Sequence, residues 1–332
     1  MILRSFASNQ PYTLIVIPLT VGAALLPSIS QKSLPLVNCG FPADDLFHWV
    51  YQSQNAIVWT SIVLILGGAI LANMVFNKHE FHNVPVYVPA LMYTVLGTTI
   101  ALIQLSLPAL LANVFVLAAL NRHLRIFRQS RVLAEYFESG FWYGLAAVFF
   151  PPYLLLIAGL WATTLVMRAF HWREHFLPIV SFCVPFLYWI VWKYWQGELG
   201  QLVLFYKTFT YDSRSYFHDF GNINMLFSIA AAGSFIGAIP RYIFLSDRAT
   251  NKARSVKNIF LIMALCMVLC MLLGYVFILK WILLSVLLPL TFVIGYWFTN
   301  YRFSLIAPFV FYFLCVCSVL VVLNFYGLLH AS

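Results

Sequence analysis

Eleven apolar runs divide this sequence and limit it to folds whose solvent is lipid. They cover residues 12–29, 56–76, 84–105, 107–120, 141–150, 152–167, 176–192, 224–244, 259–279, 281–298 and 304–326. Because 63% of the residues are hydrophobic and only 9% are charged, a soluble fold would have too little interior to bury them. The runs also lack the alternation of outer-membrane barrel strands. We therefore predict an all-α, polytopic transmembrane helix bundle with about eleven membrane segments, forming one integral membrane domain over residues 1–332.

Three of the runs are too short to cross a bilayer as straight helices. At a rise of 1.5 Å per residue, residues 107–120, 141–150 and 152–167 would span about 21, 15 and 24 Å. The pair Pro151 and Pro152 removes two backbone donors and must end a helix. Irregular backbone at membrane depth occurs only where protein or a water-filled cavity covers it. Two interpretations stay open, a tight turn at the far surface or partial helices around a cavity.

The distribution of Lys and Arg sets the expected orientation. If the N-terminus is cytoplasmic and the segments alternate, inner loops and adjoining helix ends hold fourteen of the 19 cations. The other five are Lys32, Lys193, Lys207, Arg214 and Lys280. The net charge of +9 then reflects cations that face the anionic inner surface of a bilayer, and predicts no nucleic-acid partner.

This orientation divides the domain into three parts. Residues 1–192 hold the first seven helices, an outer loop at 30–55 and an inner amphipathic helix at 122–138 that we expect in the membrane interface. Residues 193–223 form a second outer loop rich in aromatic residues, and residues 224–332 form four C-terminal helices.

Adjacent carboxylates, Asp44 and Asp45, stand in the first outer loop of a chain that has only ten acidic residues. Either one can act as a general base toward an acceptor hydroxyl, or bind a divalent metal ion. The alternative is a helix N-cap, which would begin an interfacial helix with Phe47, Trp49 and Tyr51 at the membrane surface.

The second outer loop combines cations with many aromatic residues. Lys207, Arg214 and His218 can neutralise a phosphate group, because ammonium and guanidinium groups bind phosphate oxygens well. The aromatic side chains can stack on a sugar or simply dock in the head-group region.

A third candidate is the sequence His171-Trp172-Arg173-Glu174-His175. It has the H-x-x-E-H spacing in which two imidazoles bind zinc and the Glu acts as the base, so His171, Glu174 and His175 are metal candidates. The motif lies in a short loop between segments with no obvious third ligand, and interfacial histidines are the alternative.

The first half of the chain resembles an uncharacterised family of polytopic inner-membrane proteins from Bacteroidota. The resemblance covers mainly residues 1–190 and rests on Ser5-Phe6, Asn9-Gln10-Pro11, Leu110-Leu111-Ala112-Asn113-Val114-Phe115, Asn121-Arg122, Phe137-Glu138-Ser139-Gly140-Phe141, Phe150-Pro151 and Trp172-Arg173-Glu174. It implies a multi-pass protein of the bacterial inner membrane, but it does not indicate any activity.

The order of outer loop, short mid-chain helices and second outer loop is similar to that of GT-C glycosyltransferases. This resemblance implies an enzyme that uses a polyprenyl-phosphate-linked sugar at the periplasmic face. Asp44 or Asp45 would be the base, and Lys207, Arg214 and His218 would hold the donor phosphate. The chain departs from the pattern in being short and lacking a soluble outer domain. The alternatives are a non-catalytic scaffold of an envelope complex, and a lipid or solute transporter.

Overall fold

The computed structural model describes residues 6, 13–30, 33–36, 44–79, 81, 84–126, 132–167, 171–197, 200, 222–247, 251–277, 282–300 and 306–328. Within these ranges the regular secondary structure is helical, and the β-structure is one isolated bridge between Leu36 and Leu105. The α-helices are α2 (Thr13–Leu25), α3 (Asp44–Tyr51), α4 (Gln54–Lys78), α5 (Val88–Ile103), α6 (Leu107–His123), α7 (Leu133–Phe149), α8 (Leu156–Met167), α9 (Trp172–Trp195), α11 (Asn222–Asp247), α12 (Asn251–Phe277), α13 (Ile282–Thr299) and α14 (Ile306–Phe325). Three 3-10 segments join them, η1 (Leu26–Ile29), η2 (Leu124–Ile126) and η3 (Pro151–Leu155).

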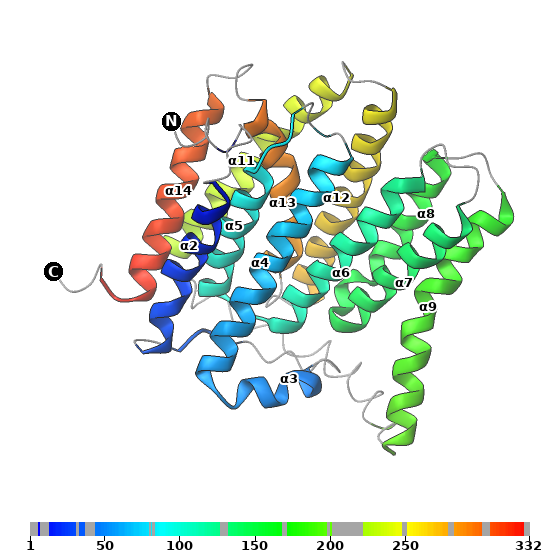
Figure 1. Cartoon of the computed structure of the whole chain (residues 1–332), viewed down its shortest axis with the longest axis horizontal. Coiled ribbons are helices and arrows are strands. Elements are labelled where there is room, and N and C mark those ends of the chain that lie inside the picture. Colours follow the sequence, from blue (N-terminus) through cyan, green and yellow to red (C-terminus); the bar gives the residue numbers. More distant parts are fainter. Residues whose placement is uncertain are drawn as a thin grey trace.

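The prediction of an all-α integral membrane protein is confirmed. Every helix above except α3 matches one of the eleven apolar runs, in the same order. Among the described helices, five stretches are long and apolar enough to cross a membrane. These are Gln54–Lys78, Leu107–Ile126, Trp172–Trp195, Asn222–Phe244 and Ile306–Phe325. Figure 1 shows the helices packed side by side as one bundle, with α3 lying across its lower end.

One end of the bundle, which we name the basic face, gathers the last turns of α4, α6 and α8. His79 follows α4 and hydrogen-bonds Asn121 of α6 at 3.3 Å, while His123 of α6 lies 2.8 Å from Thr163 of α8. The same end, uppermost in Figure 1, holds the close of α11 and the start of α12. The described cations at this face are Lys78, Arg122, Arg125, Arg173, Arg241, Arg254 and Lys257.

The other end of the bundle, which we name the opposite face, has its own contacts between helices. Tyr326 after α14 donates to the carbonyl of Ala24 in α2 at 2.8 Å, and the bridge between Leu36 and Leu105 ties the segment after η1 to the start of α6. Among described residues, Lys193 near the end of α9 is the one cation here. The described helices therefore alternate in direction, and their cations collect at one end as the charge count predicts.

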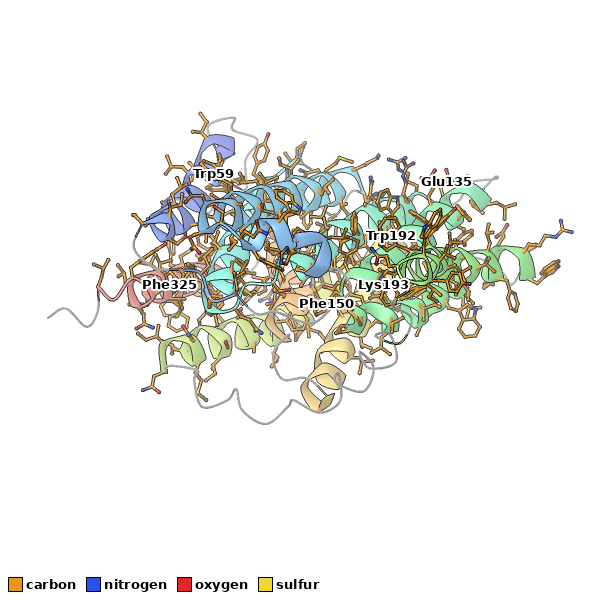
Figure 2. The ribbon with its side chains drawn as sticks, turned by 90° about the horizontal axis from the view of Figure 1, so that it is seen from below. Trp59, Glu135, Phe150, Trp192, Lys193 and Phe325 are labelled. Atoms are coloured by element: carbon orange, nitrogen blue, oxygen red, sulfur yellow. The ribbon has the colours of Figure 1, made fainter. Side chains whose placement is uncertain are left out.

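Burial differs sharply between α6 and α9. In the apolar stretch of α6, 72% of the residues are buried, against 28% in α9. The α9 side chains Trp192, Tyr194 and Trp195 are all exposed, and Figure 2 shows Trp192 and Lys193 on this outlying helix. The same view places Trp59 at the edge of the molecule and Phe150 toward its middle. Helix α6 is thus a core helix, and α9 presents apolar and aromatic surface to lipid.

The break at Pro151 is confirmed, because α7 ends at Phe149 and α8 begins at Leu156. The two flanking segments are longer than the apolar runs suggest. Helix α6 continues through polar residues to His123, and α7 begins at Leu133, so α7 alone spans about 25 Å. The break therefore lies a whole helix length away from the basic face, as expected for a turn toward the far surface.

Residues 122–138 are not one amphipathic helix in the described structure. Their described parts belong to the end of α6, to η2 and to the start of α7, and residues 127–131 lie outside the described ranges. Glu138 at the end of this stretch instead forms an ion pair between helices, with Arg122 of α6 at 2.9 Å. An interhelical ion pair and an interfacial helix produce the same sequence pattern.

Candidate functional site in the bundle core

Asn113 is a polar residue in the middle part of α6 and is fully buried. Its amide nitrogen donates to the carbonyl of Leu284 in α13 at 3.1 Å, and its oxygen accepts a hydrogen bond from the hydroxyl of Tyr153. Tyr153 belongs to η3, directly after the proline pair. A buried amide without partners is costly, so this network fixes the break against α6 and α13.

Two further polar contacts continue along α6 toward the basic face. His79 and Asn121 form one, and burial lowers the pKa of His79, which lies one residue beyond the apolar stretch of α4, to about 4. His123 and Thr163 form the other. The Thr163 hydroxyl is also 2.8 Å from the carbonyl of Gly159, so it can donate there and accept from Nε2 of His123. Nδ1 of His123 is buried with no hydrogen-bond partner among the described residues.

Other buried polar atoms in the described part of the core also lack a hydrogen-bond partner. They are Asn73 Oδ1 in α4, Tyr93 OH in α5, Tyr143 OH in α7 and Trp297 Nε1 in α13. Buried polar groups usually bind protein, water or a ligand, so each is a position where a polar molecule would find a partner. Together with the α6 contacts they place polar groups inside the bundle.

Lys257 of α12 is a buried cation, with 4% of its surface exposed. Its ammonium donates to the hydroxyl of Tyr296 in α13 at 2.7 Å and lies 4.5 Å from the centre of that ring. Tyr242 of α11 donates to the main-chain carbonyl of Lys257 at 3.0 Å. Two tyrosines thus hold this lysine between three helices by hydrogen bonds and a cation–π contact. The polar and basic sequence that precedes Lys257 does not predict this burial.

The candidate carboxylates Asp44 and Asp45 are the first two residues of α3, at the opposite face. Helix α3 packs against α4 and α6. The candidate phosphate ligands Lys207, Arg214 and His218 lie outside the described residues. The role of these five residues stays a prediction.

The candidate metal residues lie at the start of α9. His171 is the N-cap, and its carbonyl accepts the main-chain N–H groups of Glu174 and His175. Nδ1 of His175 also lies 3.0 Å from that carbonyl. In the ranges that the structure describes, no three His, Cys, Asp or Glu side chains are placed to share a metal ion. His171 therefore begins α9 as its N-cap, and a metal role of the motif stays a prediction.

Comparisons with known proteins give one relevant similarity. The chain is 26% identical over 148 residues to the "Uncharacterized transporter YcgH" of Bacillus subtilis (strain 168). That alignment covers 38% of this chain and 33% of the Bacillus protein, so the chain matches about a third of that transporter's length. No protein-family model matches the chain, and no solved structure matches it.

Proposed function

We propose that this integral membrane protein is a transporter whose polar solute moves through the bundle core beside α6. The observation that carries the proposal is the row of buried polar side chains on this helix. Asn113 lies toward the opposite face, and Asn121 and His123 lie at the basic face. The eight residues from Asn113 to Asn121 correspond to about 12 Å along the helix. The similarity to an uncharacterised transporter supports the same class.

A polar row has two physical explanations. Asn, Thr and His side chains can serve only as interhelical hydrogen bonds, which is what a scaffold needs. A transporter also needs these groups to meet water or solute, since a polar solute must exchange its hydration for protein contacts inside the membrane. Nδ1 of His123 has no hydrogen-bond partner among the described residues, and this favours transport. In a network that serves only packing, every buried acceptor should be paired.

Thiol accessibility separates these explanations. The six native cysteines are replaced by serine, and Asn113→Cys and Asn121→Cys are made singly and reconstituted in vesicles. A membrane-impermeant thiol reagent should label position 113 from the opposite face and position 121 from the basic face. Val116→Cys is the matched control, because Val116 is an apolar and fully buried residue of the same helix. Labelling of both positions no faster than position 116, in folded protein, would support a scaffold and overturn the transporter.

A second candidate is the GT-C-like glycosyltransferase, which the position of α3 favours. This short helix lies across the opposite face, and Asp44 and Asp45 begin it. In this proposal the opposite face is periplasmic, the N-terminus is cytoplasmic, and one of the two carboxylates removes the proton of the acceptor hydroxyl. Lys207, Arg214 and His218 hold the phosphate of a polyprenyl-linked donor, and a divalent metal ion can assist them.

Sugar transfer in vesicles tests this second candidate. Asp44→Asn with Asp45→Asn should abolish release of labelled sugar from a polyprenyl-phosphate donor, because an amide cannot accept the acceptor's proton. Glu135→Gln is the control, since it removes a carboxylate from the start of α7 at the basic face. Full transfer by the double variant would reject the assignment of the base.

A further inference from the structure

Three cations converge where α4 and α6 end at the basic face. The hydrogen bond between His79 and Asn121 brings together their sequence neighbours, Lys78 and Arg122. Arg125 follows in η2, one turn after Asn121. Lys78, Arg122 and Arg125 therefore stand at neighbouring positions on the adjoining ends of α4 and α6. Three like charges within interaction distance destabilise the site unless an anion accompanies them.

The described residues supply only part of the negative charge that would balance these three cations. Glu138 of α7 pairs with Arg122 at 2.9 Å, and both side chains are about 40% exposed. Lys78 and Arg125 form no ion pair with any described residue. The Nε of Arg125 is buried and has no hydrogen-bond acceptor in the described part of the chain. A guanidinium group in this state is an unfilled donor site for a carboxylate or phosphate oxygen.

The location favours phosphate in a lipid. The apolar stretches of α4 and α6 end at Lys78 and Ile126, so the cations stand at the height where a bilayer presents its head groups. Leu133 and Phe137 of α7 are 49% and 41% exposed, and Phe137 directly precedes the Glu138 that pairs with Arg122. An acyl chain can pack on these side chains while its head group meets the cations.

We propose that Lys78, Arg122 and Arg125 form a binding site for the phosphate group of an anionic phospholipid at the basic face. Arg125 and Lys78 donate to the phosphate oxygens, and Arg122 is held in place by Glu138. This site is independent of whether the bundle core transports a solute, and it gives the basic face a specific ligand in addition to its general attraction for anionic lipid.

Native mass spectrometry of the full chain, released from detergent that contains phosphatidylglycerol or phosphatidylcholine, tests the site. We expect phosphatidylglycerol to be retained and phosphatidylcholine to be lost. Arg125→Gln should weaken retention about fivefold, the effect of one lost cation at a membrane surface. Arg125→Lys should restore part of it, which separates charge from folding. Arg173→Gln is the matched control, because it removes an exposed cation at the same face, beside Trp172 and outside the cluster.

The outcomes are distinct. Inorganic phosphate at millimolar concentration gives a second measurement. If it stabilises the wild type against unfolding as well as phosphatidylglycerol does, and stabilises Arg125→Gln less, then the phosphate site stands and its ligand is soluble. Equal retention of the two lipids overturns the proposal, as does an equal loss in Arg125→Gln and Arg173→Gln.

Discussion

The side-chain amide of Asn113 donates to the main-chain carbonyl of Leu284, which lies 171 residues later in the sequence, at 3.1 Å. This hydrogen bond joins α6 to the first turn of α13. The hydroxyl of Tyr153 in η3 donates a second hydrogen bond, to the side-chain oxygen of Asn113. One side chain therefore connects a core helix, the break at the proline pair and the C-terminal part of the bundle. This is the arrangement expected where irregular backbone is protected by protein.

Asn113→Ala should lower the free energy of unfolding by about 1–3 kcal/mol, because it leaves a buried carbonyl and a buried hydroxyl unpaired. Tyr153→Phe should cost less, since it leaves one buried group unpaired, the side-chain oxygen of Asn113, instead of two. The two changes share one network, so their combined effect should be smaller than the sum. Unfolding curves of the three variants in one detergent measure this, and additive effects would mean that the two side chains act independently.

The approach of α7 to α9 gives a second prediction. A Cβ atom added to Gly140 would collide with the side chain of Ser181, and one added to Gly144 would collide with the main-chain carbonyl of Phe182. Small residues four apart allow helices in membranes to pack this closely. Gly144→Ala should therefore destabilise the protein by roughly 1–3 kcal/mol. Gly67→Ala in α4, where a Cβ meets nothing within 4 Å, is the control and should leave the thermal midpoint nearly unchanged. Equal effects would contradict the close contact.

Apolar runs and prolines were enough to predict the described helices other than α3. They gave the order of the eleven segments and the end of α7 before Pro151, because burial in lipid and the missing proline donor are local properties. The end of α6 and the start of α7 were missed because they depend on contacts with other helices, which are not local properties of the sequence. Asn121 and His123 interrupt the apolar run, and hydropathy does not register that His79 and Thr163 satisfy them from other helices.

The candidate site was less accessible to sequence reasoning. Lys257 follows a polar basic stretch, so its sequence position suggested a loop, but Tyr242 and Tyr296 bury it from helices 15 and 39 residues away. A tyrosine inside each of two apolar helices was the available signal, and only the packing shows that both meet the same lysine. Arg122 and Arg125 were likewise assigned to an inner amphipathic helix at residues 122–138, which does not predict that Lys78 of α4 lies beside them.

The free energy of unfolding should decrease as the pH is lowered from about 6.5 to about 4, and His79 should cause part of this decrease. Burial lowers the pKa of this ring to about 4 in the folded chain, against 6.5 for an exposed histidine. Over that range the unfolded chain takes up the proton first, so acid favours unfolding by up to about 3 kcal/mol at pH 4. His79→Gln keeps an amide donor for Asn121 and does not titrate, so its thermal midpoint should fall less over the same range. A parallel decline in both proteins would assign the effect to other groups.

Lys257 and Tyr296 should respond to substitution in opposite ways. Tyr296→Phe removes the acceptor of a buried ammonium group and should lower the free energy of unfolding by about 2–3 kcal/mol, because the charge keeps only its ring contact. Lys257→Met removes the charge itself and fills similar volume, so stability should be unchanged or higher. Thermal unfolding of both variants in detergent measures the contrast.

If transport is lost in Lys257→Met while its stability is kept, the lysine serves the solute path, since a lysine that only held helices together would be replaceable by methionine. If Lys257→Met is the less stable variant, the ammonium group is a structural contact, and its tyrosine partners stabilise the fold more than the burial of charge destabilises it.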